Sequence, residues 1–198
     1  MHRCARVIKL YTIILRPSGH LHAEPMLIEN FNHTIDNWIN ALKWYNYAQL
    51  TTKPSPSRWS IGQVYMHLLD DTYYYIEQIQ VCVANNDHAS DHATPEGKIM
   101  LLNNDFPDEI LEGSPSNAFM PQPESKEQLM SDLLNLKMSM NNAATLISES
   151  PFHGKTKHPG LDYFNANEWL QFAEMHLRHH LRQKKRIDEF LKGIKFIN

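Results

Sequence analysis

Hydrophobic residues recur every three to four positions in four long stretches of the chain, a spacing typical of amphipathic helices. The first stretch covers about residues 30–49, and the second starts at Ser60 and fades near residue 85. The third covers about 125–148 and the fourth about 165–192. No segment alternates between apolar and polar residues over a useful length. The pattern therefore predicts an all-α chain.

Three of these stretches begin with clear helix-start signals. In a capping box, the N-cap side chain and the side chain three positions later each accept a hydrogen bond from the other residue's backbone N–H. The pairs with this spacing are Ser60 and Gln63, Ser125 and Gln128, and Asn165 and Glu168. Hydrophobic staples can support two of the starts, through Trp59 with Val64 and Phe164 with Trp169.

Two longer connections separate the helices. Residues 86–124 are rich in Asn, Asp, Pro and Gly, and a connection of this length in a compact domain is usually functional or partly ordered by itself. Residues 151–164 form the second connection and hold Gly154, Pro159 and Gly160. Four helices with one apolar face each imply an antiparallel-type four-helix bundle, with a long connection between helices two and three.

The N-terminal residues carry no helical pattern of this kind. The apolar run at residues 7–15 is interrupted by Lys9, is short for a signal peptide and is far too short to span a bilayer. We expect residues 1–25 to be an N-terminal extension and residues 26–198 to be the bundle domain. One hypothesis is that Met26 is the natural start.

Composition narrows the class of protein. A chain of 198 residues with 42% apolar and 21% charged residues is ordinary for one soluble globular domain. Its formal net charge of −3 gives no electrostatic argument for binding nucleic acid or an anionic membrane, and the basic residues near the C-terminus lie on the expected outer face of the fourth helix. Cys4 and Cys82 make no disulfide framework, which favours a cytoplasmic protein.

The fourth helix carries three histidines close together. At about 100° per residue, His176 and His180 fall near the centre of the apolar face, His179 falls at its rim and Arg178 points to solvent. Two imidazoles four residues apart can reach one metal ion, although His176 and His179 can also chelate. The alternative is a pair of hydrogen-bonded core histidines, because buried ring nitrogens need partners. We assign no role to the remaining histidines outside the second helix, among them His158.

The second helix offers a third candidate ligand, His67. It begins a polar seam at the edge of the apolar face, which continues through Asp71 and Tyr74 and either lines a cleft or borders solvent. Asp71 lies one turn away and can orient the imidazole. Asp71, Tyr74 and His179 are candidates for proton transfer, although each also fits an ordinary structural role. Cys82 lies about four turns, roughly 22 Å, beyond His67 and is not a ligand.

Three motifs in chain order resemble those of the DinB/YfiT-like superfamily. Residues 58–68 are similar to the family's Trp-Ser-x-x-(Glu/Gln) helix opening, with its histidine at His67. Residues 158–170 resemble its His-Pro…Glu-Trp approach to the last helix, and residues 176–183 resemble its closing His-x-x-His-His-x-x-Gln. One departure concerns Gly160, which directly follows His-Pro where the family's glycine commonly lies a few residues later. This departure weakens the match of the loop to the family pattern, and it does not change which histidines align with the family's metal ligands.

The resemblance covers about residues 27–193 and implies a four-helix bundle that binds a divalent metal ion, zinc or nickel, through His67, His176 and His180. Three ligands leave a coordination position open, as in catalytic zinc sites. Such a position can activate water for hydrolysis or a substrate thiol for transfer, and the family includes proteins of both descriptions.

These observations lead to two functional hypotheses. The first is a metal-dependent hydrolase or thiol-dependent S-transferase that acts on a small-molecule substrate, such as a low-molecular-weight thiol. The second is a non-catalytic metal-stabilised helical module in stress response or partner binding. Aromatic residues at Trp38, Trp44 and 73–75 either form a homodimer surface or pack internally.

Overall fold

The computed structural model describes residues 23–107 and 119–195, and this part of the chain is mostly helical. Most of the expected extension, residues 1–25, lies outside the described residues, and the first helix already begins at Ala23. The elements are α1 (Ala23–Leu42), α2 (Tyr47–Thr51), α3 (Ile61–Cys82), α4 (Pro95–Asn103), α5 (Lys126–Glu149), β1 (Lys155–His158), β2 (Asp162–Asn165) and α6 (Ala166–Lys192).

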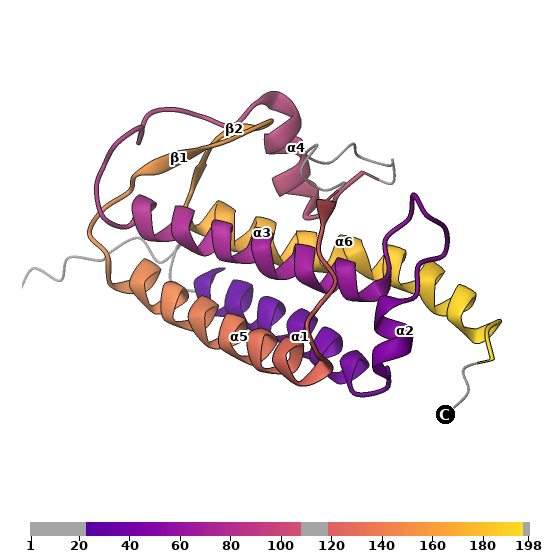
Figure 1. Ribbon diagram of the computed structural model, residues 1–198. Coiled ribbons are helices and arrows are strands. Elements are labelled where there is room, and N and C mark those ends of the chain that lie inside the picture. The colour runs from indigo at the N-terminus through magenta and orange to yellow at the C-terminus, as the bar shows by residue number, and fades with distance from the viewer. Residues whose placement is uncertain (1–22, 108–118, 196–198) are drawn as a thin grey trace, which may run out of the picture.

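The four long helices lie alongside one another in two layers (Figure 1). Helix α3 packs against α5 and α6, and α1 packs against the same two helices, so α1 and α3 occupy opposite corners. The short hairpin β1–β2 and α4 cover the α3–α6 layer on the side away from α1 and α5 (Figure 1). The core between the helices is apolar, and its largest fully buried side chains include Trp38, Tyr65, Phe31 and Trp169.

The predicted starts of three long helices are confirmed. Ser60 and Asn165 each form a complete capping box, at the starts of α3 and α6. Ser125 caps α5 through the backbone N–H of Gln128, but the Gln128 side chain instead donates to Asp132. The rings of Phe164 and Trp169 pack 5.2 Å apart, as expected of a staple.

The first helix and the connections differ from the sequence prediction. The stretch predicted as one helix over residues 30–49 is two helices, because the chain leaves α1 after Leu42 and Asn46 caps α2 with its own capping box. The prediction of a purely helical chain was wrong at β1 and β2, which pair antiparallel from Lys155 with Asn165 to His158 with Asp162. Helix α4 lies within the long connection predicted over residues 86–124.

The aromatic residues divide between core and surface. Trp38 is fully buried and Tyr75 nearly so, whereas Trp44 is 86% exposed and Tyr73 and Tyr74 are partly exposed. Internal packing therefore accounts for two of these five side chains. No helix in the described part of the chain combines the length and the apolar character needed to cross a membrane.

Candidate metal centre

The three histidines predicted as ligands meet where α3 faces α6. His67 lies in the second turn of α3, and His176 and His180 lie one turn apart in the middle of α6. His67 is 5% and His176 7% exposed, and His180 is half-buried. The Trp59 ring packs 5.0 Å from the His67 ring and covers it from the segment before α3. His67 lies at the edge of the apolar face of α3, but its side chain is buried because α6 and Trp59 cover it.

The Nε2 atoms of the three rings converge on one point. They are 3.2 Å apart between His67 and His176, 3.2 Å between His67 and His180, and 3.1 Å between His176 and His180. Nitrogen ligands at about 2.0–2.1 Å from a tetrahedral zinc ion are about 3.3–3.4 Å apart, and those at right angles around an octahedral ion are about 2.9 Å apart. The observed separations lie between these two values. The donor set therefore fits a divalent ion.

Hydrogen bonds among the three rings cannot satisfy this cluster. A ring nitrogen of a neutral imidazole carries either a hydrogen or a lone pair, so among three mutually adjacent nitrogens at least one pair must be alike. Like pairs repel, and the group is too buried for water to relieve the repulsion cheaply. In His180 the other nitrogen, Nδ1, lies 2.8 Å from Gln183 Oε1, which directs the Nε2 lone pair toward the cluster. A cation is the partner that accepts all three lone pairs.

The electrostatic surroundings keep the three rings neutral. Burial lowers the pKa of His67 to about 4, with a smaller contribution from His179. Burial, followed by the neighbouring His67, lowers the pKa of His180 to about 3, and burial holds the pKa of His176 well below its ordinary value. Neutral imidazole is the form that binds metals, so at neutral pH no proton has to leave.

Asp71 lies on the Nε2 side of the cluster. Its Oδ2 atom is 3.6 Å from Nε2 of His67 and 3.6 Å from Nε2 of His176, and it accepts a hydrogen bond of 3.4 Å from the Tyr75 hydroxyl. Burial raises the pKa of Asp71 to about 6. The sequence suggested that Asp71, one turn from His67, orients its imidazole. The carboxylate faces the point where the three nitrogens meet, and within the described part of the chain Nδ1 of His67 has no hydrogen-bond partner.

The other two candidates for proton transfer make ring contacts around the cluster. The Tyr74 ring packs edge-on against Tyr75 and Trp169, and it is Tyr75 that contacts His176, at 5.8 Å between ring centroids. His179 is half-buried, with its ring 5.3 Å from that of His180 and 5.1 Å from that of Phe106. Asp71 is the candidate with an oxygen atom 3.6 Å from two of the ligand nitrogens.

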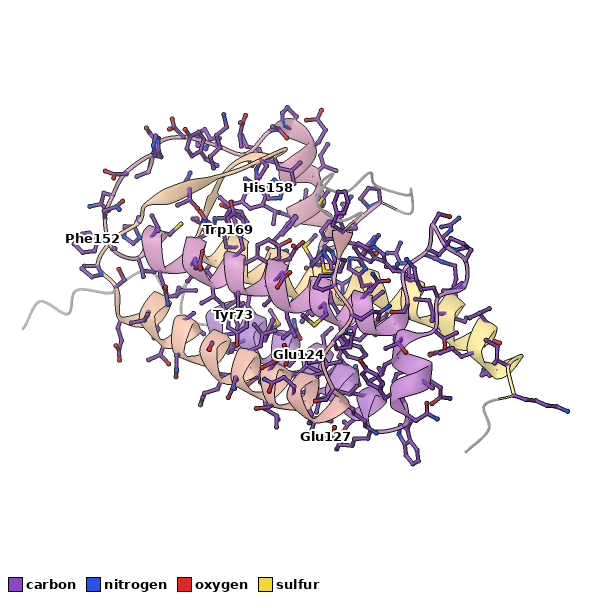
Figure 2. All side chains as sticks on the ribbon, viewed as in Figure 1. Tyr73, Glu124, Glu127, Phe152, His158 and Trp169 are labelled. Atoms are coloured by element: carbon purple, nitrogen blue, oxygen red, sulfur yellow. The ribbon has the colours of Figure 1, made fainter. Side chains whose placement is uncertain are left out.

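Two residues expected at the surface prove to be structural. His158 in β1 is half-buried against Phe164, Trp169 and Phe172, where burial lowers its pKa to about 4 (Figure 2). Arg178 does not simply point to solvent, because it pairs with Glu174 at 3.0 Å and with Asp105 at 3.3 Å. Helix periodicity gives the Arg178–Glu174 pair, which is four residues apart on α6, but it cannot give the contact of Arg178 with Asp105 beyond α4 or the packing of His158 against α6.

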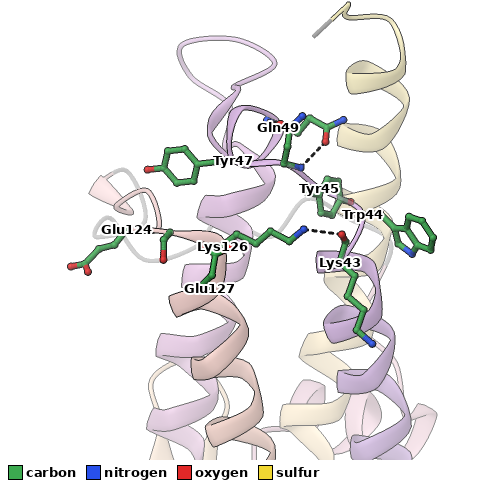
Figure 3. A pocket seen from close by; sticks show the side chains of 10 residues that line it. Lys43, Trp44, Tyr45, Tyr47, Gln49, Glu124, Lys126 and Glu127 are labelled. Carbon is green, nitrogen blue, oxygen red and sulfur yellow. Dashed lines mark hydrogen bonds between the residues drawn. The ribbon is translucent and has the colours of Figure 1, made fainter. Parts of the chain in front are cut away.

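Away from the histidines, a hollow lies at the end of the molecule where α1, α2 and α5 meet (Figure 3). Lys43, Tyr47 and Lys126 are among its lining residues, and Lys126 donates to the backbone oxygen of Lys43. None of the three histidines lines it. We assign it no chemistry, because its residues are of both charges and lie open to solvent.

Comparison with known proteins gives one match. A family model described as the DinB superfamily matches residues 27–183, which include all three histidines of the cluster. No curated protein matches the chain, and no solved structure matches it.

Proposed function

The chain belongs to the DinB superfamily, and on that premise we propose that it is a metal-dependent enzyme whose ion is held by His67, His176 and His180. The observation that carries the proposal is the convergence of three buried, neutral Nε2 atoms from two helices. We further propose that α1, α3, α5 and α6 form a four-helix bundle of the DinB type, with zinc or nickel as its ion.

Three histidine ligands would leave at least one coordination position of the ion for water or a substrate. An ion held by them would supply Lewis acidity at its remaining position, which lowers the pKa of a water molecule or thiol bound to it. The protein's own residues bind the ion, exclude water around the rings and fix the His180 tautomer through Gln183. Three protein ligands with a fourth position left for substrate are the arrangement of catalytic rather than structural zinc sites.

Asp71 is the residue that we propose for proton transfer. Its Oδ2 atom lies 3.6 Å from two of the ligand nitrogens, and its side chain is 36% exposed, so it reaches both the site and solvent. Burial raises the pKa of Asp71 to about 6, so the carboxylate is ionised and able to accept a proton at neutral pH. His179 and Tyr74 remain as secondary candidates at the edge of the site.

Two reactions fit this arrangement. In hydrolysis, Asp71 would accept a proton from water; in thiol-dependent S-transfer, it would accept the proton of a low-molecular-weight thiol. In either case we propose a small-molecule substrate. The alternative function is a non-catalytic metal-stabilised helical module in stress response or partner binding. We also propose a cytoplasmic protein, without affinity for nucleic acid or membranes, that pairs as a homodimer through its exposed aromatic residues.

Metal content and activity together test the proposal. Elemental analysis of the purified protein should find one zinc or nickel ion per chain, which His180→Ala should remove and His153→Ala, at an exposed histidine, should leave in place. The metal-loaded protein is then screened against simple esters and amides and against pairs of thiols and electrophiles. Turnover that disappears in His180→Ala supports an enzyme. An ion that stabilises the fold without any turnover across the screen would favour the non-catalytic module.

A further inference from the structure

The chain segment that follows α4 is fastened to α6 beside the histidines. Arg178 Nη2 donates to the backbone oxygen of Asn104 at 2.6 Å, and its Nη1 lies 3.3 Å from Asp105 Oδ1. Arg182, one turn later on α6, donates to the same Asp105 oxygen at 3.0 Å and to the backbone oxygen of Phe106 at 3.5 Å. Two arginines of one helix face thus hold three consecutive residues of a segment that has no regular structure.

Arg178 is itself held in place from the opposite side. Glu174 is buried, 6% exposed, and accepts hydrogen bonds from the Thr34 hydroxyl of α1 at 2.8 Å and from Arg178 at 3.0 and 3.1 Å. A guanidinium group has a planar fork of donors, so one edge can bind Glu174 while the other faces residues 104 and 105. The buried carboxylate therefore orients the arginine before the segment docks.

Docking of this segment places Phe106 against the metal centre. The side chain is 7% exposed, and its ring centroid lies 5.0 Å from Phe172, 6.1 Å from His176 and 5.1 Å from His179. Phe106 offers no ligand atom and contributes only apolar bulk beside one ligand and one candidate proton-transfer residue. Its ring therefore covers part of the His176 and His179 rings with apolar surface.

Building on the proposed function, we propose that Phe106 is an access-limiting wall of the metal centre, seated by Asp105 between Arg178 and Arg182. The wall sets the rate at which ions and small molecules reach the three Nε2 atoms. It leaves the affinity for the ion unchanged, because Phe106 offers no ligand atom. A barrier of this kind slows association and release by the same factor.

The exchange kinetics of the metal ion test this assignment. Association of zinc with the metal-free protein and its release to an excess of a chromogenic chelator are followed by stopped-flow absorbance in the wild type, Phe106→Ala and Phe106→Leu. We expect Phe106→Ala to raise both rate constants about tenfold, equivalent to a barrier lowered by about 1.4 kcal/mol, with the dissociation constant unchanged within about twofold. Phe106→Leu should remain near the wild type because it retains most of the bulk. Phe152→Ala, at a phenylalanine that is 42% exposed, is the matched control.

A second variant changes the ion pairs of Asp105 with Arg178 and Arg182 and leaves the Phe106 ring in place. Asp105→Asn keeps the ring and removes the charge that both arginines bind, and Asp105 is exposed enough for the fold to tolerate the change. Asp105→Asn should raise the rate constants for zinc association and zinc release by the same factor. That factor should be smaller than the one for Phe106→Ala. Unchanged rates in both variants would overturn the inference, as would faster release with unchanged association, which indicates damage to the ligands. A wild type that binds no zinc would refute the proposed function as well.

Discussion

Replacing Asp71 by Asn tests whether its carboxylate acts on the ion. Its Oδ2 atom lies 3.6 Å from two ligand nitrogens, so its charge stands within about 4 Å of a divalent ion held by them. A unit charge at about 4 Å from a doubly charged ion contributes roughly 2 kcal/mol even at the dielectric constant of bulk water, or about 30-fold in affinity. The side chain is 36% exposed, so this lower limit is the appropriate one. We therefore expect Asp71→Asn to weaken zinc binding about 10- to 100-fold.

The neighbouring Asp70 supplies the matched control, because it is exposed and bears the same charge. Affinities are measured by competition with a chromogenic chelator at a pH of about 7.5, where the Asp71 carboxyl, with its pKa raised to about 6, is ionised. Asp70→Asn should change the dissociation constant less than about threefold, because an exposed charge is strongly screened. Equal affinities for Asp71→Asn and Asp70→Asn would refute the position of Asp71 beside the ion.

Three further predictions concern stability. Zinc at about 100 times its dissociation constant should raise the melting temperature of the wild type by about 5–11 °C, and it should leave that of His180→Ala unchanged; an equal rise in both would contradict the site. Gly62→Ala should cost about 1–3 kcal/mol in denaturant unfolding, because the added Cβ would lie 2.7 Å from the Leu50 oxygen, whereas Gly160→Ala, with nothing within 4 Å, should be neutral. Ser60→Ala should cost about 1–2 kcal/mol in the same assay because the α3 N-cap is lost, and a wild-type midpoint would argue against that cap.

The starts of the long helices were predictable because capping is local. Ser60 and Asn165 recruit backbone N–H groups three positions away, so their role can be read from four residues. The apolar face of α6 is also a local pattern, and it placed His176 and His180 on the core side. The split between α1 and α2 carried the same kind of signal, since Asn46 and Gln49 form a capping box that the apolar spacing of residues 30–49 obscured.

The features that were missed depend on contacts distant in sequence. The strands β1 and β2 lack alternation, because only Phe164 among their residues is fully buried. Arg178 lies on the outer side of α6 by periodicity, yet it is half-buried because the segment after α4 docks there. His67 lay at the edge of its helix face in projection, and it is buried because Trp59 and α6 cover it. Periodicity describes one helix, whereas each of these environments is created by a second element.

X-ray absorption spectroscopy of the zinc-loaded protein tests the central claim most directly. The extended fine structure reports how many imidazole rings bind the ion and what other atoms lie in its first coordination sphere. We expect three imidazoles at about 2.0–2.1 Å together with at least one light atom that no protein imidazole supplies. Two or fewer imidazoles, or an ion that retains three in His180→Ala, would contradict a centre built from His67, His176 and His180.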